Sequence, residues 1–127
     1  MSAEILRATA SELGERIARR ELTAVEVTTA FLDQIERVDD DVKAFLHVDR
    51  AWSLDQARVV DARLDAGEKL GPLAGVPIAV KDIFCMTGAP TTAGSRILEG
   101  WRPLYDSTVV RRVREAGLVV AGKTNLD

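Results

Sequence analysis

Lys81 and Asp82 are the residues of this sequence whose types and position suit chemistry best. They stand near the far end of an apolar, β-branched run, residues 76–84, which follows a start punctuated by glycine and proline. Such a run predicts a strand buried on both faces, as in a parallel sheet. Clefts form at the carboxyl ends of strands in open α/β sheets, which makes Lys81 a candidate site residue. The alternative is a lysine that reaches solvent where its strand ends.

A second lysine lies in a pattern typical of phosphate-binding loops. Residues 117–124 match G-x-x-x-x-G-K-[ST] letter for letter, with Lys123 and Thr124 at the end. A phosphate cradle needs a strand, then a flexible loop, then a helix, so that backbone amides converge on the anion. Here the four middle residues predict a strand, and the first glycine ends a helix. We interpret the match as accidental and expect Lys123 and Thr124 to begin a loop.

The remaining reactive side chains have structural interpretations. Cys85 and His47 are the only cysteine and histidine and lie far apart in sequence, so we expect a free thiol and no zinc site. The three carboxylates at 39–41 lack the spacing of a calcium loop and predict a solvated turn that ends a helix. The Gly-, Thr- and Ser-rich residues 87–95 would let backbone amides and hydroxyls approach a ligand closely. A plain solvent loop is the alternative there.

The first half of the chain predicts a helical arm without chemistry. Capping-box patterns begin at Thr9 and Thr23 and predict helices that run to about residues 20 and 38. Residues 43–49 fit a short strand or the entry to a third helix, which we expect at 49–66 with Gly67 just past its end. The arm therefore covers residues 1–67.

The second half predicts a βαβ unit. After the long loop at 85–106, Asp106 or Ser107 is expected to cap a helix that ends at Gly117. Its valines 109, 110 and 113 should face inward and its arginines 111, 112 and 114 outward. Residues 118–121 then predict a second buried strand, parallel to the first.

Composition bounds the class of protein. The chain has 127 residues, 46% of them hydrophobic and 29% charged, which describes one soluble domain. A net charge of −3 and the lack of a basic run give no footprint for nucleic acid. No apolar run of membrane-spanning length and no signal peptide are visible, so we expect a cytoplasmic protein.

Four motifs, in order, resemble the start of the amidase signature family. They lie at residues 71–82, 91–95, 106–110 and 116–126, and residues 21–23 and 44–46 of the arm also fit. The resemblance implies an α/β amidase signature fold, of which residues 1–127 would be the amino-terminal part. Residues 1–67 would form the helical arm, and residues 68–127 the catalytic-lysine region and first strands of a larger mixed sheet.

Within that family, residues 45–48, 97–100 and 125–127 most resemble the glutaminase subunits of glutamyl-tRNA(Gln) amidotransferases. The resemblance implies a protein that hydrolyses glutamine and passes ammonia to a partner, which amidates misacylated Glu-tRNA(Gln). The other members of a heterotrimer and charged tRNA, held by the partner subunit, would be the partners. No cofactor is implied for this chain, whereas ATP and magnesium are implied for the partner subunit.

The resemblance also implies a Ser-cisSer-Lys triad with Lys81 as its base. Both serines belong to a segment downstream of residues 123–126 that this chain lacks, and Ser95 lies in a different motif. A serine hydroxyl needs a base to take its proton, and lysine serves only when neutral. Neutral lysine requires desolvation or a nearby positive dipole, and we expect the buried strand end to desolvate Lys81.

Three alternatives stay open at this point. The first is a general amidase of the same family that acts on small amides. The second is a non-enzymatic binding module, although two parallel strands make a poor independent sheet. The third is nucleotide binding through Lys123. Under the preferred interpretation, the 127-residue chain alone is inactive and only weakly folded.

Overall fold

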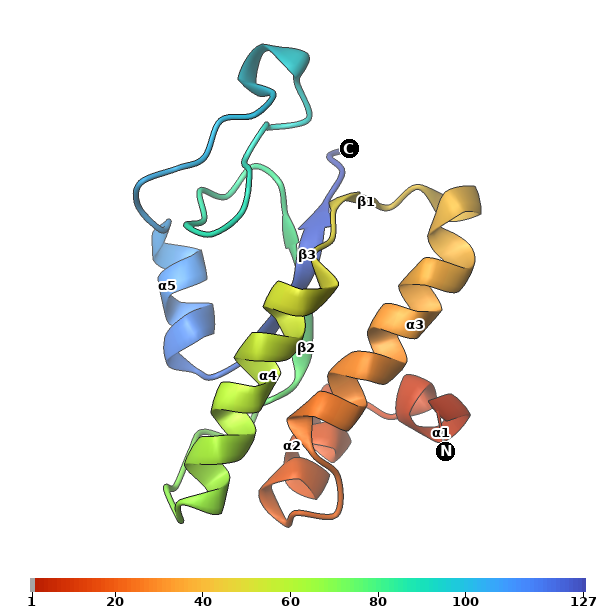
Figure 1. The fold of residues 1–127 in the computed structure, drawn as a ribbon, viewed down its shortest axis with the longest axis vertical. Helices are drawn as coiled ribbons and strands as arrows, with labels where there is room; N and C mark the ends of the chain where they lie inside the picture. Colours follow the sequence, from red (N-terminus) through yellow and green to blue (C-terminus); the bar gives the residue numbers. More distant parts are fainter. Residues whose placement is uncertain (1) are drawn as a thin grey trace.

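The sheet that positions Lys81 has three strands within residues 2–127, in the order β1-β3-β2. The computed structural model describes residues 2–127 and is shown in Figure 1. β2 (Pro77–Lys81) runs parallel to β3 (Val119–Thr124), and β1 (Phe45–His47) pairs with β3 in the antiparallel sense. The predicted parallel βαβ unit and mixed sheet are therefore confirmed. Residues 45–47 form a strand, the first of the two options left open.

The described part of the chain has five α-helices, of which α1 and α2 lie near the start of α3 (Figure 1). They are α1 (Ser2–Arg7), α2 (Ala10–Ala18), α3 (Ala24–Val42), α4 (Arg50–Asp65) and α5 (Thr108–Glu115), and a 3₁₀ turn, η1, spans Arg96–Leu98. α1 was not anticipated from the sequence. Its Ile5 is buried against Leu13 and Ile17 of α2 and Val27 of α3, so it closes the apolar end of the helical arm.

Helices cover the two faces of the sheet separately. Val119 is buried with Ala24 of α3 and Ala57 of α4, whereas Val120 is buried with Val80 and with Val110 of α5. Consecutive strand residues point to opposite faces, so α3 and α4 cover one face and α5 covers the other.

A bulge interrupts this alternation in β3. Ile78 pairs with Val120, but Ala79 pairs with Gly122, which leaves Ala121 as an extra residue. Beyond the bulge, Val80 pairs with Lys123. Because Val80 lies on the α5 face, the extra residue places Lys123 on that face as well.

Local signals fixed several helix boundaries as predicted. The Thr9 hydroxyl accepts the N–H of Glu12 at 3.2 Å while the Glu12 carboxylate accepts the N–H of Thr9 at 2.7 Å, and Thr23 and Glu26 repeat the arrangement. Ser107 caps α5, and Gly117 beyond its end has φ +79°. These patterns are readable from sequence because each cap is completed within four residues.

The predicted end of the second helix was wrong. α3 continues through the three aspartates to Val42, and Lys43 then takes a left-handed conformation with φ +55°. The reason lies in Asp39, whose carboxylate accepts the N–H groups of Ala44 at 2.8 Å and Phe45 at 3.3 Å. The aspartate therefore joins the last helical turn to β1.

Two predictions about burial were also wrong. β2 is shorter than residues 76–84, and its Ala79 is exposed, because β2 lies at the edge of the described sheet. On α5, Val109 is 47% exposed, whereas Arg114 turns inward: its guanidinium lies 5.9 Å from the Trp52 ring and donates to the Thr87 carbonyl at 2.6 Å. The ring, the carbonyl and the Asp106 carboxylate, which lies 3.1 Å from the guanidinium, hold the Arg114 side chain against the domain and leave 34% of it exposed.

Gly14 marks a close approach between α2 and the chain leading into β2. A Cβ built there would lie 2.1 Å from the carbonyl oxygen of Pro72. Gly14→Ala should therefore destabilise the chain by about 1–3 kcal/mol, although alanine is the better helix former. The urea midpoint followed by circular dichroism measures this loss.

Ser11→Ala, on the exposed side of the same helix, is the matched control. It should change the free energy of unfolding by less than about 0.5 kcal/mol. Equal midpoints for the two variants would contradict the predicted contact.

Candidate functional site

Lys81 is the last residue of β2, at the edge of the sheet where the parallel strands end. Its ammonium is paired with the carboxylate of Asp127, and the pairing holds the pKa of that carboxyl below its usual value. The segment carrying Asp127 follows β3, and Asn125 is tied to Ala44 by an N–H···O bond of 2.8 Å. Lys81 therefore lies where the sequence predicted it, at the carboxyl end of the strand.

The expected desolvation of Lys81 is not found within residues 2–127. Its side chain is 40% exposed. The cause is the edge position of β2, which has a neighbouring strand on one side only in the described part of the chain. A lysine at such an edge can be reached by water and by other groups.

Next to it, Asp82 is almost fully buried and is paired with Lys123. Asp82 is 2% exposed and Lys123 is fully buried. The Lys123 ammonium donates to Asp82 Oδ1 at 2.9 Å, to Thr91 Oγ1 at 2.9 Å and to the Pro90 carbonyl at 3.2 Å. An ammonium has three N–H donors, so its whole donor set has protein acceptors.

The same aspartate organises the Thr- and Gly-rich turn that follows. Asp82 Oδ2 accepts the N–H of Thr92 at 3.1 Å and its hydroxyl at 2.5 Å. The Asp82 carbonyl accepts the N–H of Ala93 at 3.0 Å. The hydroxyls of Thr91 and Thr92 are thus engaged with the buried pair and not directed at a ligand, as the sequence had allowed.

Sequence reasoning missed this pair, although a signal was available. Lys123 was expected to start a loop, but it lies inside β3. An ammonium beside a buried strand needs a partner, and this requirement holds for Lys123 as well as for Lys81. The nearest candidate partner in a parallel arrangement was the carboxylate of Asp82, which directly follows the neighbouring strand.

The phosphate-loop pattern at residues 117–124 does not have the geometry of a phosphate-binding loop. Lys123 has no N–H left for a phosphate, and the residues before it form β3, not a loop that opens onto a helix. Such a cradle requires free backbone amides at a helix start.

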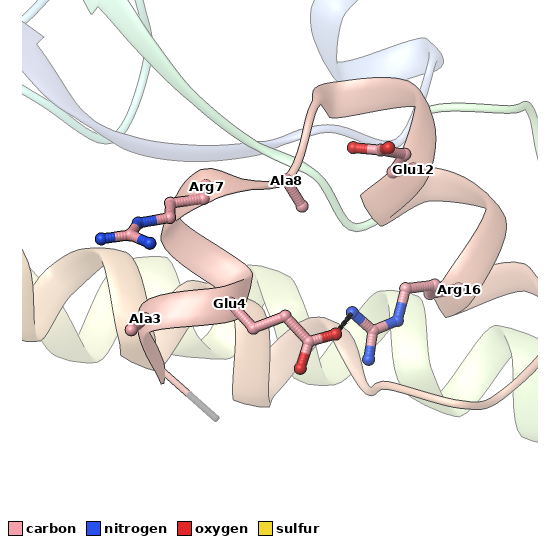
Figure 2. Close-up of a pocket in the computed structure, with 6 residues that line it drawn as sticks. All are labelled: Ala3, Glu4, Arg7, Ala8, Glu12 and Arg16. Atoms are coloured by element: carbon pink, nitrogen blue, oxygen red, sulfur yellow. Dashed lines mark hydrogen bonds and ion pairs between the residues drawn. The ribbon is translucent and has the colours of Figure 1, made fainter.

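The larger hollows among the described residues all have charged side chains in their linings, and two of them lie beside the Thr- and Gly-rich turn and in the helical arm. One, of about 280 Å³, lies beside the turn at Thr92 and Gly94 and is bordered by Leu46 of β1. The other, of about 560 Å³, lies between α1 and α2, and Figure 2 shows its charged lining. There Arg16 donates to Glu4 at 2.7 Å, so these charges hold the two helices together.

Cys85 and His47 are the remaining candidate residues. The Cys85 thiol donates to the Tyr105 hydroxyl at 3.8 Å, and burial lowers the pKa of His47 in β1. Within residues 2–127 no three His, Cys, Asp or Glu side chains gather as a metal site would require. Among the described helices none combines the length and the apolar character needed to cross a bilayer.

The burial of Lys123 predicts that this chain does not bind ATP. Isothermal titration of the chain with ATP and magnesium should give no saturable heat, because the lysine of the pattern is enclosed. Nucleotide affinity that disappears in Lys123→Ala but persists in Lys69→Ala, an exposed control, would contradict the prediction.

Comparison with known proteins finds curated relatives along nearly the whole chain. The A subunit of the glutamyl-tRNA(Gln) amidotransferase of Cutibacterium acnes is 61% identical over 124 residues, 98% of this chain and 25% of that protein. Its counterpart from Salinispora arenicola is 65% identical over 118 residues, 93% of this chain and 24% of that protein. The chain spans about a quarter of the length of these relatives.

Solved structures share its fold. The native peptide amidase from Stenotrophomonas maltophilia matches with a TM-score of 0.88 and 35% identity, over 94% of this chain and 25% of that one. A fatty acid amide hydrolase matches with a TM-score of 0.91 at 24% identity, over 99% of this chain and 22% of that one, a likeness of fold alone. The predicted α/β amidase signature fold is confirmed. The amidase family model matches residues 26–127, and the chain therefore belongs to the amidase family, as its motifs predicted.

Proposed function

We propose that this chain is the amino-terminal part of the glutaminase subunit of an amidotransferase that converts Glu-tRNA(Gln) to Gln-tRNA(Gln). Ammonia would come from glutamine, and Lys81 would be the base of a Ser-cisSer-Lys triad. The observation that carries the proposal is the identity of 61% and 65% with the amidotransferase relatives, over more than nine-tenths of this chain. The division into an arm, 1–67, and a catalytic-lysine region, 68–127, stays a prediction.

The position of Lys81 supports its role as the base. It lies at the carboxyl edge of the parallel strands, where α/β sheets place their sites. Base catalysis needs a neutral amine, whereas the Asp127 carboxylate now pairs with this ammonium. We therefore propose that a segment downstream of Asp127 brings the serines, displaces this carboxylate and shields Lys81 from water. Lys81 would then take the serine proton during attack on the glutamine amide and return it to the departing ammonia.

The proposal assigns the remaining components to partners. The other members of a heterotrimer would receive the ammonia, and the partner subunit would hold charged tRNA, ATP and magnesium. A nucleotide in this chain does not fit, because Lys123 is enclosed by Asp82, Thr91 and Pro90. The assembly is proposed to work in the cytoplasm.

A general amidase acting on small amides is the second candidate. The match to a peptide amidase at 35% identity and a TM-score of 0.88 favours it. Assaying the complete protein with glutamine and with small aliphatic amides separates the two, because only the first candidate requires a preference for glutamine.

In the complete protein, Lys81→Arg should reduce glutamine hydrolysis by at least about 100-fold, the usual scale for loss of a general base. Arginine keeps the positive charge but does not give up its proton at working pH. Ammonia release measures the rate, and Lys69→Arg on the exposed surface is the control. Near-normal turnover in Lys81→Arg would refute the assignment of the base.

The 127-residue chain alone should release no ammonia from glutamine. A base without a serine nucleophile cannot form an acyl intermediate, and both serines are proposed to lie downstream. The measurement compares ammonia release by the isolated chain with a buffer blank. Turnover by the chain that is lost in Lys81→Arg would show that a nucleophile lies within these residues.

A further inference from the structure

Lys81 and Asp82 are neighbours whose side chains point to opposite faces of the sheet. Val80 and Lys123 are paired on the α5 face, and Lys81 is paired with Thr124 on the other. Asp82 returns to the α5 face, where it meets the Lys123 ammonium at 2.9 Å. Asp82 is thus enclosed in the interior, while the Lys81 side chain, on the edge strand of the described sheet, is 40% exposed.

Both the backbone and the side chain of Asp82 are held by hydrogen bonds. Its N–H donates to the Thr124 carbonyl at 3.0 Å, and its carbonyl accepts the N–H of Ala93 at 3.0 Å. Its two carboxylate oxygens are taken by Lys123 and by Thr92. The Cα–Cβ direction of Lys81, one residue earlier, is set by this anchored peptide.

Stability alone is a weak reason for such a pair. Enclosing an ammonium and a carboxylate costs solvation that their attraction repays only in part, and apolar replacements of similar volume are often as stable. The β3 bulge at Ala121 is a further irregularity, and it is what brings Lys123 to the α5 face. Bulges commonly re-aim a side chain beside an active site.

We propose that Lys123, acting through Asp82, is a positioning residue that fixes the direction of Lys81 at the reaction site. The inference rests on the proposed function of Lys81 and adds to it a second lysine that never contacts substrate. Lys123 keeps its three acceptors throughout, while Lys81 takes and returns the serine proton.

The test uses the complete protein and glutamine as substrate. Lys123→Met removes the ammonium and leaves the buried Asp82 carboxylate without a countercharge, which threatens the fold. The double variant Lys123→Met/Asp82→Asn removes both charges and keeps the side-chain volumes, so it separates positioning from folding. Lys69→Met, on the exposed surface, is the matched control.

The double variant should keep the wild-type melting temperature within a few degrees and KM within about twofold, with kcat lowered by about 100-fold, the scale expected for a misplaced catalytic group. Hydrogen exchange should rise at residues 92–93, whose amides bond to Asp82, and stay unchanged at Gly75, whose amide bonds to Gly117.

Two results would overturn the inference: unchanged kcat in the folded double variant, or a double variant that fails to fold, which assigns the pair to stability alone. Lys81→Arg is assayed in parallel. An active Lys81→Arg refutes the proposed function itself, whereas an inactive Lys81→Arg beside a fully active double variant refutes only the positioning role.

Discussion

The enclosed ion pair of Lys123 and Asp82 is the constraint on which the structure at the carboxyl ends of β2 and β3 depends. An ammonium without water must find an acceptor for each proton, and a carboxylate must find donors for its lone pairs. Meeting both needs takes groups from three stretches: Asp82 directly after β2, Lys123 near the end of β3, and residues 90–92 of the long loop. The first part of the long polar loop, where Met86, Ala89 and Thr91 are buried, is therefore packed against the sheet, whereas residues 96–102 are exposed.

Features set by short-range chemistry could be predicted from the sequence. Both capping boxes, the Ser107 cap and the glycine after α5 involve residues within one helical turn of each other. The βαβ order followed from apolar runs separated by an amphipathic stretch. The location of Lys81 at a strand end followed from the same runs. The pairing of its neighbour, Asp82, with Lys123 did not.

Features set by distant partners could not be predicted. The continuation of β3 through Lys123 depends on Asp82, which is 41 residues away. The inward turn of Arg114 depends on Trp52, and the extension of α3 depends on a backbone that only later becomes β1. The exposure of Lys81 reflects the edge position of β2 in the described sheet. That position depends on the order of the strands and cannot be read from the amino-acid sequence of β2 itself.

The placement of β3 has a consequence for how the chain assembles during synthesis. The central strand of the described sheet, β3, comes after both of its partners, β1 and β2, in chain order. Phe45 of β1, for example, pairs with Thr124 of β3. Helices α2 and α3 carry their own caps and can form as they leave the ribosome, whereas the ladders of the described sheet need β3, whose pairing with β2 begins at Val119. Before β3 is available, β1 and β2 lack their common partner, so closure of the described sheet depends on non-local contacts.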